Sequence, residues 1–371
     1  MQSSASIEGE AAHLVAGFHY LEDPAPESLG ETPEALLAAL PGPTLIYLNG
    51  EDPRRTRALV TLLHGNEPSG LRALHRWLRG GVRPQVNIVC LIASTEAARM
   101  TPLFSHRVVP GRRDLNRCFR APFDIDAEGL LAQRILAVLT RYQPESVIDI
   151  HNTSGSGPSF AVSINADARH LALTTLFTRR MVLTDLRLGS LMEISEHMVP
   201  MVTIECGGRL DDAAHSLAWA GIDHYFRRAE VLHDERAEIP VEVMQNPVRL
   251  ELTACCTLAY ADAPQDDVHL TLRPGIEHYN FGVTPAGTEL GWVRGAALGE
   301  LFVARNNART CLLRDLLVLD QGVLRTRQPL KLFMITGNAD IAKSGCLFYA
   351  VQADGRELVP GDSADGPDNA P

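Results

Sequence analysis

The sequence predicts an α/β protein with a mixed, mostly parallel sheet, and three observations support this prediction. Short apolar runs without a charged residue recur in its first two thirds, at 43–49, 58–63, 86–93 and 201–204. Such runs are typical of strands that are buried on both faces between helices. Stretches with apolar residues at helical spacing separate these runs. Near residue 235 the pattern changes to short alternating runs broken by turns, which indicates a second, smaller β-rich domain.

Four segments are therefore expected within the 371 residues, a length that allows two domains. They are an N-terminal extension at 1–40 with one short helix at 32–40, an α/β domain at 41–235, a β-rich domain at 236–355 and a disordered tail at 356–371. The tail is rich in Asp, Gly and Pro, a composition that buries too little apolar surface to fold.

Composition limits the partners that the protein can have. The net charge of −11 argues against a nucleic-acid partner, and no apolar run approaches the roughly 20 residues of a membrane helix. The first residues lack the pattern of a signal peptide. Seven scattered cysteines predict reduced thiols and a cytoplasmic protein. A homo-oligomer is left open.

The first domain divides into elements at apolar runs, helical patterns and turn residues. Pro68 suits the first turn of a helix, where its missing N–H costs little, and the segment 94–126 is predicted to be a long irregular loop. Besides the four apolar strands, the expected elements are a turn at 50–53, strands at 146–150 and 160–164, and helices at 69–79, 127–141, 168–180 and 211–230.

Reactive side chains follow three of the predicted strands. His64 and Glu67 follow one strand, His151 follows a second and Glu205 a third. The carboxyl ends of parallel strands meet at one edge of a sheet, where α/β proteins bind ligands. His64, Glu67 and His151 would supply a His₂Glu zinc site with a fourth position for water. Taken singly, each histidine could equally be a structural residue.

Glu205 is the candidate general base. Zinc lowers the pKa of a bound water to about 7, and a nearby carboxylate could take its proton and pass it to a leaving nitrogen. The alternative role for Glu205 is a strand-end carboxylate that caps the next helix.

A cluster of arginines suggests that the substrate is anionic. Residues 99–120 carry six arginines and one acidic residue, Asp114, which we expect to position the loop. Asn116 and Arg117 could bind a substrate carboxylate, since a guanidinium holds a carboxylate with two parallel hydrogen bonds. A second arginine could polarise the scissile carbonyl. The alternative is a solvated arginine-rich loop.

Four motifs, HGNEPSG, DLNR, DIHNTSG and TIECGG, occur in this order between residues 55 and 230. Together they resemble the aspartoacylase and succinylglutamate desuccinylase family, in the zinc carboxypeptidase superfamily. The resemblance implies a zinc-carboxypeptidase-like fold with one zinc ion per chain. Carried over by motif, it implies His64, Glu67 and His151 as zinc ligands, Glu205 as the acid/base, and Asn116 and Arg117 as carboxylate-binding residues, with Asn152 also lining the substrate site.

The family's carbonyl-polarising arginine is harder to place by resemblance. It lies a few residues before DLNR, where Arg107, Arg112 and Arg113 compete. Arg107 is preferred because RVVP resembles the matching stretch after a small insertion. Tyr260 and Tyr279 are candidates for the family's substrate-contacting tyrosine in the second domain.

Together these features predict a zinc-dependent amidohydrolase that cleaves the amide bond of an N-acyl amino acid, a small anionic substrate. One alternative is a carboxypeptidase-like metallopeptidase acting on small peptides. Another is a non-catalytic zinc- or ligand-binding module, against which the presence of Glu205 argues.

Overall fold

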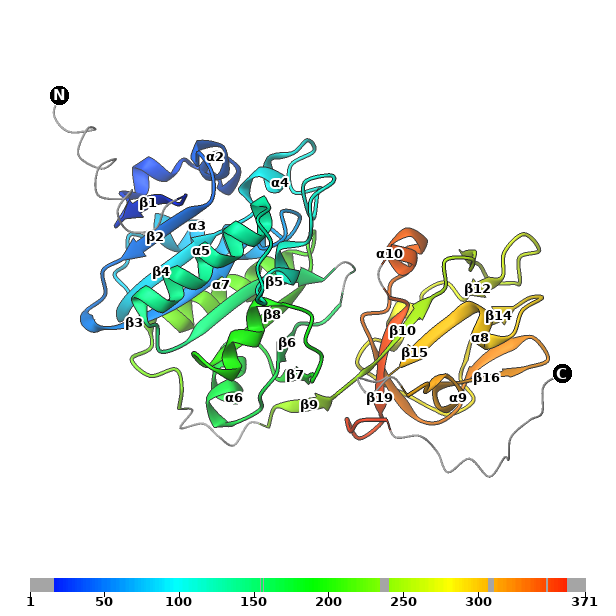
Figure 1. Ribbon diagram of the computed structural model, residues 1–371. Helices are drawn as coiled ribbons and strands as arrows, with labels where there is room; N and C mark the ends of the chain where they lie inside the picture. The colour runs from blue at the N-terminus through cyan, green and yellow to red at the C-terminus, as the bar shows by residue number, and fades with distance from the viewer. Residues whose placement is uncertain are drawn as a thin grey trace. The chain divides into compact units, whose positions relative to one another are not determined.

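The computed structural model describes residues 17–153, 155, 157–233, 240–305, 310–344 and 346–358 (Figure 1). Its contacts divide the chain into two compact units. The first contains residues up to Thr153 together with 159–181 and 187–241, and the second contains 154–158, 182–186 and the chain from Glu242. No helix among the described residues is long and apolar enough to cross a membrane.

The first unit is built on a mixed sheet with the strand order β1-β2-β4-β3-β5-β8-β6-β7. Its central neighbours, from β4 through β3 and β5 to β8, are all parallel, whereas β2 and β6 run antiparallel to their inner partners. These strands are β1 (His19–Glu22), β2 (Thr44–Leu48), β3 (Asp52–Thr61), β4 (Val86–Ile92), β5 (Val147–Thr153), β6 (Phe160–Ser163), β7 (Arg180–Leu183) and β8 (Met201–Gly208).

Helices cover both faces of this sheet, which confirms the predicted fold class. The longer ones are α3 (Ser69–Arg79), α5 (Ala127–Tyr142) and α7 (Asp212–Arg227). Figure 1 shows α5 on one face and α3 with α7 on the other. The shorter elements are η1 (Pro26–Leu29), α2 (Pro33–Ala39), α4 (Thr95–Arg99), η2 (Leu115–Arg117), α6 (Ala168–Thr175) and η3 (Leu191–Glu196).

Alternate residues of β3 explain why its run is apolar throughout. Ala58 and Val60 belong to the core beneath α5, where Ile135 and Val138 cover them. Thr61 faces α3 instead, because a Cβ atom added to Gly70 would lie 2.2 Å from its Oγ1. The strand is therefore buried on both faces, as its composition predicts.

Several elements differ from the sequence prediction. Strand β3 begins at Asp52 rather than 58, because its polar first half pairs with β4. Strands β5 and β8 continue to Thr153 and Gly208, so His151 and Glu205 lie within the last residues of their strands. The helix predicted at 168–180 ends at Thr175 and is followed by β7. Further elements were missed, among them β1 in the N-terminal extension and α4 in the loop predicted at 94–126.

The second unit contains two five-stranded sheets in its described part, which confirms a smaller β-rich region. Their orders are β13-β18-β19-β10-β15 and β11-β12-β14-β17-β16, and leucines of both sheets, such as Leu250 and Leu290, share one core. The elements are β9 (Glu242–Gln245), β10 (Val248–Leu252), β11 (Leu258–Tyr260), β12 (Leu270–Leu272), η4 (Ile276–Tyr279), β13 (Val283–Thr284), β14 (Glu289–Val293), α8 (Leu298–Leu301), β15 (Phe302–Arg305), α9 (Leu313–Leu316), β16 (Leu317–Asp320), β17 (Val323–Thr326), β18 (Leu330–Phe333), α10 (Ala339–Ser344) and β19 (Phe348–Gln352).

The predicted domain boundaries stay predictions. Of the tail predicted at 356–371, residues 359–371 lie outside the described residues, as do residues 1–16 of the predicted N-terminal extension.

Candidate metal centre

The turn from β3 to α3 is held in place by close packing. Leu62, just after β3, is buried with a left-handed φ of 54°, a costly conformation for a residue with a side chain. A Cβ atom added to Gly65 would lie 2.5 Å from the backbone nitrogen of Ala98, so only glycine fits there. Gly70 is equally tight against Thr61. The HGNEPSG segment is thus a rigid turn that presents His64 and Glu67 at the carboxyl end of the sheet.

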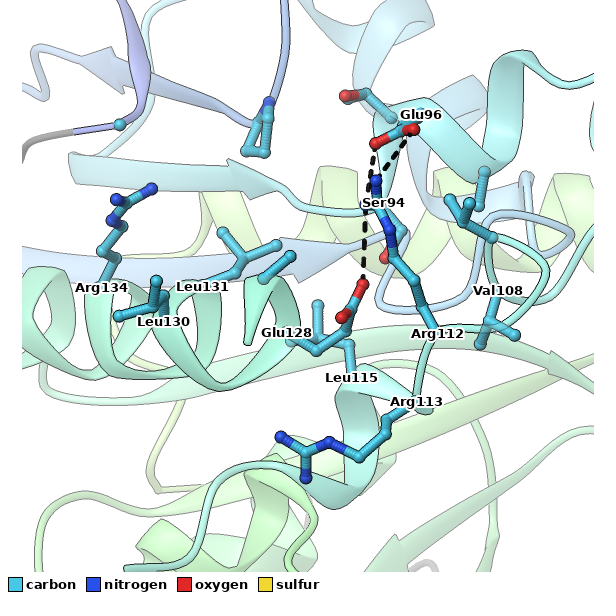
Figure 2. Close-up of a pocket in the computed structure, with 16 residues that line it drawn as sticks. Ser94, Glu96, Val108, Arg112, Arg113, Leu115, Glu128, Leu130, Leu131 and Arg134 are labelled. Atoms are coloured by element: carbon cyan, nitrogen blue, oxygen red, sulfur yellow. Dashed lines mark hydrogen bonds and ion pairs between the residues drawn. The ribbon is translucent and has the colours of Figure 1, made fainter. Parts of the chain in front are cut away.

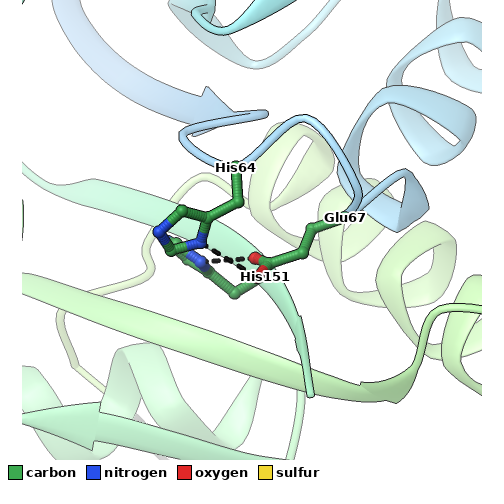
Figure 3. Close-up of side chains that lie close together, drawn as sticks. All are labelled: His64, Glu67 and His151. Carbon is green, nitrogen blue, oxygen red and sulfur yellow. Dashed lines mark hydrogen bonds and ion pairs between the residues drawn. The ribbon is translucent and has the colours of Figure 1, made fainter. Parts of the chain in front are cut away.

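His64, Glu67 and His151 converge at that end, each at most 5% exposed (Figure 3). One ligand atom from each residue can be chosen so that all lie within 4.8 Å of one another. The Glu67 carboxylate lies between the histidines: Oε1 is 2.9 Å from Nδ1 of His64, and Oε2 is 2.6 Å from Nδ1 of His151.

This donor set fits a zinc ion. Two imidazole nitrogens and a carboxylate are ligands that zinc takes in catalytic sites. Despite its nearness to Glu67, the buried Nδ1 of His64 forms no hydrogen bond with any described residue. A buried nitrogen left in this way is expensive, and a cation between the three side chains would satisfy it.

A carboxylate holds the second nitrogen of each histidine. Nε2 of His151 lies 2.7 Å from Oδ2 of Asp149, and Nε2 of His64 lies 2.9 Å from Oδ1 of Asp114. A proton on each Nε2 leaves the Nδ1 lone pair free for a metal, an arrangement common among metal-binding histidines. Sequence reasoning missed the role of Asp149, although Asp-x-His within one strand places both side chains on the same face.

The electrostatics of the cluster also favour a cation. Burial alone would raise the pKa of Glu67, but the two histidines outweigh it and hold that pKa well below its usual range. Burial would lower the pKa of His151, yet Asp149 and Glu67 raise it well above its ordinary value. His151 therefore favours its protonated form in this cluster, and a divalent cation can take the place of that proton.

Glu205 lies beside this cluster. It pairs with His151 in the register of the parallel strands β5 and β8. Its Oε2 is buried and forms no hydrogen bond with a described residue. Burial raises the pKa of Glu205 to about 7, although the charge of His151 opposes the shift. A carboxyl group with this pKa can both accept and return a proton near neutral pH.

Arg107 is the arginine that the structure brings to the cluster. Its Nη1 lies 3.2 Å from Oε1 of Glu67, and its Nη2 lies 3.1 Å from Oδ2 of Asp114. Nη2 is also 2.7 Å from Nε2 of His64. Two donors cannot bond to each other, so the carboxylate of Asp114, which accepts from both, holds them together.

The two competing arginines bind other acidic residues. Figure 2 shows Arg112 between Glu96 and Glu128, with Nη1 2.8 Å from Oε2 of Glu96. Arg113 pairs with Asp126 at 2.6 Å.

The three predicted substrate-binding residues differ in the hydrogen bonds that their side chains make within the protein. Asn116 is buried, and its Oδ1 accepts a hydrogen bond from the backbone N–H of Leu191. Arg117 is exposed and pairs with no acidic side chain among the described residues; its Nη1 donates to the carbonyl of Asn116. Both ends of the Asn152 carboxamide are bound within the protein. Their roles toward substrate stay predictions.

The two candidate tyrosines have partners within the second unit. The hydroxyl of Tyr260 donates to the carbonyl of Thr336, and the ring of Tyr279 packs on His278. Neither contact assigns a role toward substrate.

A mixed sheet with helices on both faces, and a buried His–Glu–His cluster at the ends of its central parallel strands, define an α/β protein of the carboxypeptidase-like fold. Residues 53–219 match the family model of the succinylglutamate desuccinylase/aspartoacylase catalytic domain. The match confirms the resemblance of the four motifs to that family. No sequence among the curated proteins matches the chain.

Solved structures share the fold at low sequence identity. A succinylglutamate desuccinylase from Vibrio parahaemolyticus is 13% identical, with a TM-score of 0.54, and the match covers 82% of this chain and 85% of that one. A succinylglutamate desuccinylase/aspartoacylase from Rhodobacter sphaeroides is 19% identical, with a TM-score of 0.51 and coverage of 80% and 84%. These similarities extend the shared fold beyond the segment that matches the family model.

Proposed function

We propose that the protein is a zinc-dependent hydrolase that cleaves the amide bond of an N-acyl amino acid. The observation that carries the proposal is the buried cluster of His64, Glu67 and His151 with the unpaired carboxylate oxygen of Glu205 beside it. The family match of residues 53–219 supports a deacylase rather than a peptidase. We also propose that the protein acts in the cytoplasm, as its scattered cysteines suggest.

In this proposal His64, Glu67 and His151 hold one zinc ion. Bound zinc would supply an activated water and a Lewis acid for the substrate carbonyl. Asp149 and Asp114 orient the two histidines through their outer nitrogens, so that the ligand nitrogens need little rearrangement to bind the ion.

The other residues bind the substrate and move protons. Glu205 accepts a proton on its carboxylate and then donates it to the leaving nitrogen, so that an amine departs rather than an amide anion. The guanidinium of Arg107 stabilises the negative charge that develops on the carbonyl oxygen. Arg117, exposed and without an acidic partner among the described residues, binds the carboxylate of the amino-acid part together with Asn116.

A hydrolysis screen with the purified full chain tests the proposal. N-acyl amino acids with acidic and neutral side chains are compared with dipeptides that have a free carboxyl end. We expect amine release from acyl amino acids, loss of activity with a chelator and recovery with zinc. The Arg112→Ala variant is the control and should retain activity, because Arg112 pairs with Glu96 instead of the cluster.

Two outcomes would contradict the proposal. Hydrolysis that is indifferent to chelation would remove zinc from the reaction. Efficient cleavage of dipeptides without cleavage of acyl amino acids would indicate a metallopeptidase instead.

A further inference from the structure

The first turn of α3 has no cap from its own sequence. Its N-cap position is Pro68, whose side chain makes no capping hydrogen bond, and the first N–H groups of a helix need acceptors. The backbone N–H of Ser69 donates instead to Oδ1 of Asn152, at 3.0 Å. Asn152 lies on β5, next to His151. The turn that carries Glu67 is therefore fixed by a side chain from another strand.

The orientation of the Asn152 carboxamide is fixed by its other end. Nδ2 donates to the carbonyl of Gly207 at 2.9 Å and to Oγ of Ser69 at 2.8 Å. The backbone N–H of Asn152 also donates to Oε2 of Glu67 at 3.3 Å. Residues of the β3–α3 turn, of the first turn of α3 and of the ends of β5 and β8 thus belong to one hydrogen-bond network.

His215 of α7 is the outermost member of this network. Its Nδ1 lies 2.7 Å from Oγ of Ser69, a residue with no exposed surface. Both amide protons of Asn152 are used, one of them on Oγ of Ser69, so the serine proton is free to go to Nδ1 of His215. That bond requires an imidazole without a proton on Nδ1. Burial and the nearby charge of Arg72 lower the pKa of His215 and favour its neutral form, against the opposing effect of Asp212 and Asp211.

We propose that His215 is a positioning residue for the metal site. His215 accepts a hydrogen bond from the Ser69 hydroxyl, so that the hydroxyl oxygen is left to accept from Asn152. This arrangement sets the first turn of α3 and the direction of Glu67. The inference rests on the proposed function, because it assigns Glu67 to a metal. In this role His215 binds neither the metal nor the substrate; it acts on Glu67 through Ser69 and Asn152.

Two substitutions separate this role from simple packing. His215→Leu fills a comparable volume without an acceptor, whereas His215→Asn places an amide oxygen where Nδ1 lies. The matched control is His170→Leu, since Nε2 of His170 makes a similar contact of 2.6 Å with Oγ of Ser195 in the same unit. The readouts are the zinc dissociation constant by chelator competition, the absorption spectrum of the Co²⁺-loaded protein, and kcat and KM.

We expect His215→Leu to weaken zinc binding about tenfold, at the lower end of the effect of outer-shell residues. It should alter the Co²⁺ spectrum and lower kcat with KM little changed. His215→Asn should restore most of the affinity and the spectrum, and His170→Leu should lower the Tm without changing zinc affinity. Ser69→Ala removes the same hydrogen bond with a smaller change and should weaken zinc binding likewise, which keeps the test available if His215→Leu does not fold.

Wild-type zinc affinity in His215→Leu, or equal losses in His215→Leu and His215→Asn, would overturn the inference. Failure of the wild-type protein to bind zinc would overturn the proposed function itself, so the two failures are distinguishable.

Discussion

Around the two ends of strand β5, buried polar groups differ in how completely they are paired. At the amino end, Arg57 of the adjacent strand β3 has no exposed surface, and each guanidinium nitrogen has a partner: Nε binds Glu145 at 2.6 Å, Nη1 binds the carbonyl of Tyr225 and Nη2 that of Ala229, both at 2.7 Å. At the carboxyl end, five buried polar atoms form no hydrogen bond with described residues: Oγ1 of Thr61, Nδ1 of His64, Oδ1 of Asn66, Oδ1 of Asp149 and Oε2 of Glu205.

The difference separates a structural end of the sheet from a functional one. A buried charge with every partner in place holds elements together, here β3, β5 and the end of α7. Buried groups without partners cost free energy, and their concentration at one edge indicates a site that a ligand completes. Substitutions at the amino end should therefore affect stability, and those at the carboxyl end should affect metal binding and chemistry.

The largest expected effect is that of Glu205→Gln on hydrolysis. Loss of the proton-transfer group should reduce kcat by about 10²- to 10⁴-fold. The Tm should not fall, because the substitution replaces an unpaired buried carboxyl group with a neutral amide. Steady-state kinetics and a thermal melt measure the two effects. A variant with full activity would exclude Glu205 from the reaction.

At the opposite end of the sheet, Arg57→Met should destabilise the protein by about 3 to 5 kcal/mol, as expected when one partner of a buried pair is removed. Three backbone carbonyls of the α7 end would lose their donor. Urea unfolding measures the loss, and kcat of the folded variant should stay unchanged. Arg55→Met is the control: Arg55 binds Glu145 from a more exposed position and should contribute less than about 1 kcal/mol. Equal losses of unfolding free energy in the two variants would contradict the structural role assigned to Arg57.

The arginines offer a comparison within one loop. Arg107→Ala should lower kcat by about 10²- to 10³-fold, the effect of removing one donor to an oxyanion. Arg112→Ala should change kcat by less than about threefold, because it removes only ion pairs with Glu96 and Glu128, neither of which belongs to the cluster. An equal loss of kcat in the two variants would contradict the assignment of Arg107 to the reaction.

The smallest of these effects is expected for Asp149→Asn. The substitution keeps the shape of the side chain but removes the charge that holds Nε2 of His151. Zinc affinity should fall by about 10- to 100-fold, measured by chelator competition. An unchanged dissociation constant would show that Asp149 does not support the ligand.

Local signals in the sequence predicted much of this arrangement. The helix at 69–79 was predicted with the bounds of α3, because apolar spacing and Pro68 define it locally. Strands β1 (HYLE) and β7 (RMVL) were missed because each has only four residues and includes a charged one, so neither is a continuous apolar run. The cluster of His64, Glu67 and His151 could be predicted because these residues follow the carboxyl ends of apolar strands, which meet at one edge of the sheet. Asp149 and His215 did not, because their roles depend on side-chain directions and on the approach of α7 to α3.

The central claim is that His64, Glu67 and His151 bind zinc, and calorimetric titration of the metal-free protein tests it most directly. We expect one zinc ion per chain, and binding weakened by orders of magnitude in His151→Ala. The Arg57→Met variant, assayed where it is folded, should bind zinc as the wild type does. Absence of zinc binding by the wild type, or unchanged binding by His151→Ala, would contradict the account.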